Sequence, residues 1–281
     1  KAEPSRKTNN LASSLAKHVH KDAVFSTPAD DLAILRENIS KITPETCHQA
    51  LRKFWDIEDI TLILTTNAPQ DNADHTLSTL YAESRAIEVS PPEKKAAASF
   101  AYTDFGKPGT IIQQSHIKDL DITQVSFHNG CSCNIKKTDF NKNSINLTAR
   151  VGAGKLTMPM DKPGLHMFAS SAFGAGGLGQ HSSDDLDRIL AGRNAGIGFQ
   201  VGEDAFILSG STTPEDLELQ LQLLCAYLTD PGLRPEGERM FKAQLPSIYA
   251  QMKHTPAGAQ AEMAALLRGN DARFVFPTLE Q

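Results

Sequence analysis

The sequence predicts an α+β fold in which an antiparallel sheet packs against helices. Stretches with strand character follow one another between residues 103 and 152, and helical patterns form separate runs before and after them. The regular alternation of strand and helix that a parallel sheet requires is missing. With 281 residues, 40% hydrophobic and 22% charged, the chain is long enough for one to two domains with their own cores.

Charge and hydropathy argue against two classes of function. The net charge of −5, from 28 Lys and Arg against 33 Asp and Glu, gives no electrostatic footprint for nucleic acid. No apolar run approaches the roughly 18 to 20 residues that span a bilayer. The four cysteines, Cys47, Cys131, Cys133 and Cys225, match neither a zinc ribbon nor a C-x-x-C redox pair.

Residues 1–70 carry the pattern of three helices and a strand. Residues 8–19 have apolar side chains at helical spacing. Thr27 and Thr43 each precede a proline and a run of acidic or polar residues, which is a helix start signal. The β-branched stretch DITLILTT, residues 59–66, predicts a buried strand. The expected buried faces are Leu32, Leu35 and Ile39 in the second helix and Cys47, Ala50, Leu51 and Phe54 in the third.

A change of composition marks a connector. Residues 67–98 contain NAPQDNADHT and SPPEKKAAAS, which predict an exposed segment interrupted by a short helix around residues 77–88. We place the linker at residues 71–115. It separates residues 1–70 from a second domain, residues 116–281.

The second domain opens with strands. Asn129 and Gly130 predict a hairpin between ITQVSF and CSCNIKKT. Residues 144–152 predict a third strand, which continues the antiparallel run. Residues 195–210 predict two more strands that turn at Gly202.

Helices complete the second domain. Ser182 begins a helix that Gly192 closes. The clearest helix of the chain starts after Thr213 and stops at an Asp-Pro-Gly sequence. Pro246 should kink or split the helix over residues 236–253. The apolar stripe expected on the clearest helix is Leu217, Leu221, Leu224 and Leu228.

The residues alone reveal no catalytic constellation. Neither H-E-x-x-H nor H-x-x-E-H occurs, and His166 and His181 lack a carboxylate at ligand spacing, which favours a core or surface pair. The glycine-rich residues 174–179 have no Lys-Ser/Thr after them, so a turn is favoured over a phosphate loop. Ser170 and Ser171 lie in no G-x-S-x-G sequence.

Cys131 and Cys133 share one face of their predicted strand because side chains alternate. Burial as small hydrophobic residues is favoured there over a metal or redox role. On this reasoning the sequence indicates an α+β protein with no visible active site.

The order of motifs nevertheless resembles the pitrilysin/insulinase family of zinc metallopeptidases, the inverzincins, which include mitochondrial processing peptidase and periplasmic bacterial proteases. ITPETCHQALRKFW before DITLILTT is similar to the last helix and strand of a domain in that family. SFHNGCSCNIKKTDFNKNSINLTARVGAG is similar to a domain opening, and PGLHMFASSAFGAGGLG occupies the place of the zinc helix. STTPEDLELQLQLLCAYLTDPGLRPEGERMFKAQL resembles the long helix, its Pro-Gly stop and the next helix. The resemblance covers residues 23–281.

The resemblance implies a domain of the type found in mitochondrial processing peptidase and LuxS, without its metal ligands. Active members have two homologous halves of two domains each, and only the first half carries H-x-x-E-H. Met167 and Ser171 stand where the two His ligands would be, and Ser170 where the general base would be. A thioether and hydroxyls cannot replace them. Residues 116–281 thus resemble the third of four domains, and residues 1–70 the end of the preceding one.

The function implied is an internal portion of a zinc-dependent metalloendopeptidase, with the zinc in the missing half and no metal or catalytic residue in this chain. The implied partners are a peptide or unfolded protein and the catalytic half, in the same chain or a partner subunit. The relatives imply a bacterial periplasm. The alternative is a catalytically inactive peptidase-like subunit that binds other proteins as a scaffold. An edge strand within residues 195–210 is expected to pair with an extended peptide if that edge is open.

Overall fold

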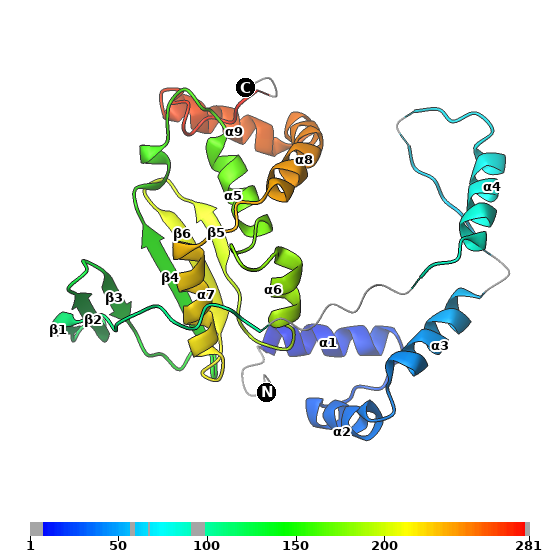
Figure 1. The fold of residues 1–281 in the computed structure, drawn as a ribbon, viewed down its shortest axis with the longest axis horizontal. Helices are drawn as coiled ribbons and strands as arrows, with labels where there is room; N and C mark the ends of the chain where they lie inside the picture. The colour runs from blue at the N-terminus through cyan, green and yellow to red at the C-terminus, as the bar shows by residue number, and fades with distance from the viewer. Residues whose placement is uncertain (1–7, 57–59, 67, 91–98, 279–281) are drawn as a thin grey trace. The chain divides into compact units, whose positions relative to one another are not determined.

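The computed structural model describes residues 8–56, 60–66, 68–90 and 99–278. The chain divides into two compact units, Lys1–Lys95 and Ala96–Gln281, which are described separately (Figure 1). The division falls within the predicted linker, residues 71–115. That the units correspond to the end of one domain and the third of four stays a prediction.

Lys1–Lys95 contains four helices in its described part: α1 (Thr8–His20), α2 (Pro28–Ile39), α3 (Pro44–Trp55) and α4 (Ala73–Ala86). The two predicted start signals are confirmed. Thr27 and Thr43 are N-caps whose side chains accept hydrogen bonds from the backbone N–H groups of Asp30 and Thr46. Each forms a capping box, which satisfies helix N–H groups that have no partner within the helix.

The buried strand predicted for residues 59–66 is wrong where the structure describes it. Residues 60–66 form no strand, and Ile63 is 86% exposed; Asp59 lies outside the described residues. A strand needs a neighbour for its N–H and C=O groups. The described part of the chain supplies none here, because all its strands belong to the second unit.

The buried helix faces predicted for this unit are also wrong. None of its described residues is buried, and Leu32, Leu35 and Ile39 of α2 are 44%, 50% and 57% exposed. The predicted face of α3 is likewise exposed. An apolar helix face becomes buried only against another element, and helical spacing by itself does not provide one.

The described residues of Ala96–Gln281 form two separate antiparallel sheets. The first has the order β1 (Ile111–Ile117), β2 (Ile122–Phe127), β3 (Ser132–Ile135). Its predicted hairpin is confirmed: β2 pairs with β3, and Gly130 in the turn has a φ of +84°, a conformation that glycine adopts without strain. The second sheet has the order β4 (Ile145–Val151), β6 (Phe206–Thr212), β5 (Gly198–Val201). The third predicted strand therefore exists, but it pairs with β6 and does not extend the first sheet.

The described helices of this unit are α5 (Leu165–Ala175), α6 (Ser183–Ile189), α7 (Leu217–Thr229), α8 (Pro235–His254) and α9 (Pro256–Leu267), with a short 3₁₀ helix at Gly154–Thr157. Of these, α5 packs on β5 and α7 on β6, whereas α8 packs on α5 and α9 on α8. The predicted split at Pro246 does not occur, because α8 continues through it. Over the described residues, no helix combines the length and the apolar character that crossing a membrane demands.

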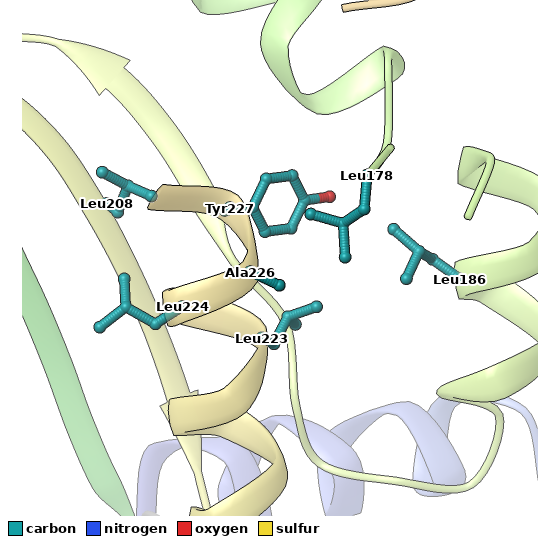
Figure 2. Packing of buried hydrophobic residues seen from close by; sticks show 7 residues of the cluster. All are labelled: Leu178, Leu186, Leu208, Leu223, Leu224, Ala226 and Tyr227. Atoms are coloured by element: carbon teal, nitrogen blue, oxygen red, sulfur yellow. The ribbon is translucent and has the colours of Figure 1, made fainter. Parts of the chain in front are cut away.

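The core of this unit lies around α7. Figure 2 shows Leu223, Ala226 and Tyr227 of α7 beside Leu178 and Leu186, which come from the glycine-rich turn and from α6. Leu208 of β6 and Leu224 complete the cluster on the side of the sheet (Figure 2). The buried surface of α7 thus faces both the sheet and the turn.

In this unit the burial predicted for the α7 stripe is confirmed for Leu224 and wrong for two other leucines, and the burial predicted for Cys131 and Cys133 is wrong. Leu221 and Leu228 of the predicted α7 stripe are 42% and 44% exposed, while Gln220 is fully buried. Cys131, which comes just before β3, and Cys133, on β3, are exposed free thiols, and the whole of β3 is exposed. A strand buries alternate residues only when another layer covers one face.

Candidate functional site

The helix α5 carries the three positions that the resemblance singles out. Gly164 precedes it with a φ of +79°, and Gly177 follows it with a φ of +65°, so glycines set both ends. It packs on α8, where the rings of Phe168 and Phe241 meet edge to face with centroids 5.5 Å apart. A Cβ at Gly237 would lie 2.9 Å from the Ala172 carbonyl oxygen, so this glycine permits the close approach of the two helices.

The same helix lies along the strand β5. The ring of Phe173 stacks on that of Phe199 with centroids 4.1 Å apart. One turn earlier, the Ser170 hydroxyl accepts a hydrogen bond from the backbone N–H of Val201 at 3.3 Å. The later residue of α5, Phe173, contacts the earlier residue of β5, Phe199, and the earlier residue Ser170 contacts the later residue Val201. The helix and the strand therefore run antiparallel.

The outer side of β5 is an edge of its sheet. The Gly202 N–H donates to the Ala205 carbonyl at 2.9 Å across the turn to β6, whereas the Val201 N–H points the other way to Ser170. Successive backbone groups of a strand alternate in direction. The N–H and C=O of Phe199 therefore point to the same outer side as the Val201 N–H. Ser170 covers this edge at Val201.

The residues at the three positions that the resemblance compares with a zinc helix do not fit a zinc ion. Zinc in proteins takes imidazole, thiolate or carboxylate ligands, and Met167, Ser170 and Ser171 offer a thioether and two hydroxyls. The Ser170 hydroxyl is bonded to Val201. Within the described ranges, His, Cys, Asp and Glu side chains form no group of three able to hold a metal.

The two histidines that flank the glycine-rich turn have different environments. His166, on α5, is partly buried; burial and, to a lesser extent, the Lys155 ammonium lower its pKa to about 4, so it is neutral at neutral pH. His181 is 5% exposed, and its Nε2 accepts a hydrogen bond from the Ala101 N–H at 2.9 Å. His181 thus attaches the chain at Ala101 to the turn that follows α5.

Of the glycine-rich residues 174–179, the first two end α5 and residues 176–179 form a turn that is tied to the chain after α7. The Arg234 guanidinium donates to the carbonyl oxygens of Gly176, Gly179 and His181, the last two at 2.8 and 3.2 Å. The Gly179 N–H donates to the Asp230 carbonyl at 2.9 Å. The prediction of a turn is confirmed, and the carbonyl groups of the turn accept hydrogen bonds from the Arg234 side chain.

Residues 100–102 are fixed on this turn. The Tyr102 hydroxyl donates to the Asp230 carboxylate at 2.6 Å and accepts from the Gln180 N–H at 2.9 Å. The Phe100 ring stacks on His181 with centroids 5.8 Å apart. These contacts, together with the Ala101 bond to His181, attach the start of the described chain in this unit to the core.

The segment before β5 is held by buried polar groups. The Gln220 amide donates to the Gly196 carbonyl and accepts from the Gly196 N–H, both at 2.9 Å. The Thr212 hydroxyl donates to the Asn194 carbonyl at 2.6 Å, and the Asp216 carboxylate accepts the Asn194 N–H at 2.8 Å. The Asn194 N–H is also the main cause of the lowered pKa of Asp216. Sequence reasoning missed these residues, which position the edge strand.

Comparisons with known proteins identify the fold. No model of a known protein family matches the sequence, and no curated protein matches it. The structure is similar to that of a mutant of the ferredoxin protease FusC in complex with Arabidopsis ferredoxin, with a TM-score of 0.53 and 15% identity over 98% of this chain and 31% of that chain. It is also similar to the periplasmic protease PqqL from Escherichia coli, with a TM-score of 0.53 and 19% identity over 97% of this chain and 30% of that chain. The chain thus has a peptidase-like α+β fold and spans about a third of these proteases.

Proposed function

We propose that this chain is an internal portion of a zinc-dependent metalloendopeptidase, and that Ala96–Gln281 is a non-catalytic, peptide-holding part of it. The zinc and the general base belong to the catalytic half, in the same protein or in a partner subunit. The shared fold with two proteases supports this proposal. The order of sequence motifs supports it independently.

One observation carries the proposal: α5, which the resemblance compares with the zinc helix, supports an edge strand through Ser170, a residue that cannot ligate zinc. Ser170 bonds the outward N–H of Val201, and Met167 and Ser171 lie within one turn of it on α5. These side chains supply neither a metal ligand nor a base. The arrangement is suited to positioning a peptide beside β5 and leaves cleavage to the other half.

The proposed substrate is an extended peptide or an unfolded protein. A peptide that adds a strand to a sheet edge binds through its main chain, which tolerates many sequences. The outward N–H and C=O of Phe199 offer such a pairing position on β5. The FusC structure contains a protein partner, ferredoxin, and is in this respect consistent with the proposal.

Backbone methylation tests the pairing. A short fluorescent peptide and its twin with alternate N-methylated amides are titrated into the chain and followed by anisotropy. We expect the methylated peptide to bind at least tenfold more weakly, because each methyl removes a donor and blocks the strand edge. Equal binding of the two peptides would show that main-chain pairing is not involved.

A peptidase assay tests whether this chain holds the peptide while the catalytic half cleaves it. The chain is incubated with zinc and an unfolded protein, alone and together with the upstream half encoded by the same gene. Cleavage in the mixture alone is expected. Cleavage by this chain alone, or stoichiometric zinc that is lost on changing His166 or His181, contradicts the proposal.

The exposed apolar faces of α2 and α3 favour a second candidate, a catalytically inactive subunit that binds other proteins. Leu35 and Phe54 are 50% and 73% exposed on these faces. If the gene lacks H-x-x-E-H upstream of Lys1, and the chain associates tightly with a partner without cleavage in any mixture, this candidate replaces the first.

For the location we propose the bacterial periplasm, since PqqL is a periplasmic protease. Osmotic-shock fractionation of the native host, with detection by an antibody against the chain, tests it. Recovery only with the cytosolic markers contradicts the proposal.

A further inference from the structure

Cys131 and Cys133 lie two residues apart at an open edge of the first sheet. The order of that sheet is β1, β2, β3, so none of the described strands pairs with the outer side of β3. Both thiols are exposed and free. Their exposure is unusual, because cysteine is among the residue types most often found buried. Neither the core nor the proposed peptide site uses these two side chains.

The pairing of β2 with β3 places the two thiols on one face of the sheet. Cys133 pairs with Val125 of β2. The Cys131 carbonyl accepts a hydrogen bond from the Phe127 N–H at 2.8 Å, so the same ladder continues through Cys131. Alternate residues of a strand point to the same side. On this side Val125 is 7% exposed while Cys133 opposite it stays exposed, so packing does not explain the thiols.

The spacing of the two cysteines decides between a disulfide and a shared ligand. Two residues of a strand cover about 6.7 Å, which is also the separation of the Cβ atoms on one face. A disulfide needs Cβ atoms about 3.5–4.5 Å apart, so the pair does not close one while β3 stays paired with β2. A metal ion in line between two thiolates, with bonds of about 2.3 Å, needs sulfur atoms only about 4.6 Å apart. Rotation about the Cα–Cβ bonds inclines the sulfur atoms towards each other and brings this separation within reach.

The donor atoms decide which kind of ion fits. Thiolates are soft ligands and select soft metals such as Cu(I). Zinc takes four ligands in its structural sites, and in the part of the chain that the structure describes no third His, Cys, Asp or Glu joins the pair. Two thiolates in line satisfy Cu(I), and the complex carries one negative charge. Lys136 and Lys137 follow β3 directly in the chain, so positive charge is close to the pair in the sequence.

We propose that Cys131 and Cys133 form a two-thiolate binding site for Cu(I). Each thiol gives its proton to the solvent when the ion binds, so two protons are released for each ion and no electron is transferred. The site lies on the first sheet, whereas β5 belongs to the second. It therefore does not depend on the peptide-holding role.

Titration of the full chain with Cu(I) tests this, without oxygen and with ascorbate as the reductant. A coloured Cu(I) chelator competes for the ion, and its loss of colour gives the stoichiometry and the affinity. We expect the wild type to take one ion from the chelator. Cys131→Ser and Cys133→Ser each leave one thiol and should bind at least about tenfold more weakly, because the second ligand of a pair acts at a high effective concentration.

Two controls distinguish the pair from thiols in general. Cys47→Ser removes a single exposed thiol on α3 and should leave the binding unchanged. The double variant Cys133→Ser/Asn134→Cys keeps the number of thiols but moves one to the opposite face of β3, and it should bind as weakly as Cys133→Ser. All of β3 is exposed, so this exchange disturbs no buried contact. Circular dichroism establishes that each variant is folded.

A measurement without a variant is X-ray absorption at the copper edge, which should show two sulfur neighbours. Oxygen or nitrogen neighbours in their place overturn the site. A wild type that takes no ion from the chelator also overturns it, and so does full binding by either single variant. Equal binding by the double variant and the wild type would show that the shared face is not needed. None of these results bears on the peptide-holding function, which the N-methylated peptides test.

Discussion

The helices of Lys1–Lys95 are capped at least as well as those of Ala96–Gln281, yet the two units differ completely in burial. Thr27, Thr43 and Ser182 all form capping boxes. No described side chain of the first unit is buried, whereas the second has a contiguous core around Leu223. The difference teaches that caps decide where a helix begins, and that a core requires a second layer. The described helices of the first unit expose apolar side chains such as Leu35 and Phe54.

The strongest test of this comparison is to separate the units. We expect residues 96–281 alone to unfold in guanidinium chloride in one steep transition, with a free energy in the usual range of about 5–15 kcal/mol. Residues 1–95 alone should lose helicity gradually, because they have no core to make the loss cooperative. A steep transition in residues 1–95, or none in residues 96–281, contradicts the comparison.

Truncation of one leucine in each unit tests the difference in burial between the two units at single residues. Leu223→Ala should lower the free energy of unfolding by about 3 kcal/mol, because Leu223 is 1% exposed and its removal leaves a cavity. Leu51→Ala should change it by less than about 0.5 kcal/mol, since Leu51 is 60% exposed. Denaturant titration of the full chain measures both. Similar losses from the two variants would mean that α3 is buried in solution.

Within the second unit, two glycines provide a contrast near the edge strand. A Cβ at Gly210 would lie less than 3.0 Å from the Gly196 carbonyl and from the Gln220 amide, so Gly210→Ala should cost about 2 kcal/mol. Gly174, on α5, has nothing within 4 Å of such a Cβ, and Gly174→Ala should be neutral or add up to about 1 kcal/mol. Thermal unfolding measures the pair, and a stable Gly210→Ala would refute the close packing described for β5.

His166 gives the second unit a dependence on pH. Because its folded pKa of about 4 is below the ordinary 6.5, the unfolded chain takes up a proton that the folded chain does not as pH falls through this window. Stability should therefore decline from pH 6.5 to about 4. A shift of this size corresponds to about 3 kcal/mol, and partial exposure reduces it to about 2 or less.

Denaturant titrations across that pH range measure the effect. His166→Gln should flatten the decline, and the exposed His128 serves as the control position for the same substitution. An unchanged pH dependence in His166→Gln would assign the decline to other groups.

The smallest expected change in the free energy of unfolding comes from removing one of two N-caps of the same kind. Ser182→Ala should lower the free energy of unfolding by about 1 kcal/mol, because α6 belongs to the core. Thr27→Ala removes an equivalent cap from α2 and should leave the main transition unchanged. It should speed amide exchange only in Pro28–Ile39. If Thr27→Ala shifts the main transition as much as Ser182→Ala does, α2 unfolds together with the core.

Local signals made much of the fold predictable. Thr27, Thr43 and Ser182 marked helix starts and Gly130 marked a hairpin, because each acts through neighbours in the sequence. The buried face of α7 was not predictable in the same way, because it includes the polar Gln220. The need for that residue comes from Gly196, a distant backbone position.

In the candidate site, too, local features were predictable from the sequence and contacts between distant segments were not. The motif order placed the helix with Met167, Ser170 and Ser171, and the structure has a helix there. The hydrogen bond from Val201 to Ser170 and the Phe173–Phe199 stack are contacts between segments distant in sequence. No spacing within one element could have indicated them. The strand prediction for residues 60–66 was wrong because a strand pattern needs a neighbouring strand to pair with. The described chain contains no such neighbour for these residues.

The attachment of residues 100–102 has a mechanical consequence. Any tension on the chain before Phe100 first loads the bonds from Ala101 to His181 and from Tyr102 to Asp230. From there the load passes to the glycine turn at the carboxyl end of α5, which Arg234 braces. The strands β1 to β3 follow the anchor in the chain and carry none of this force. Tension on the chain before Phe100 is thus taken up by the core of this unit before it reaches β1.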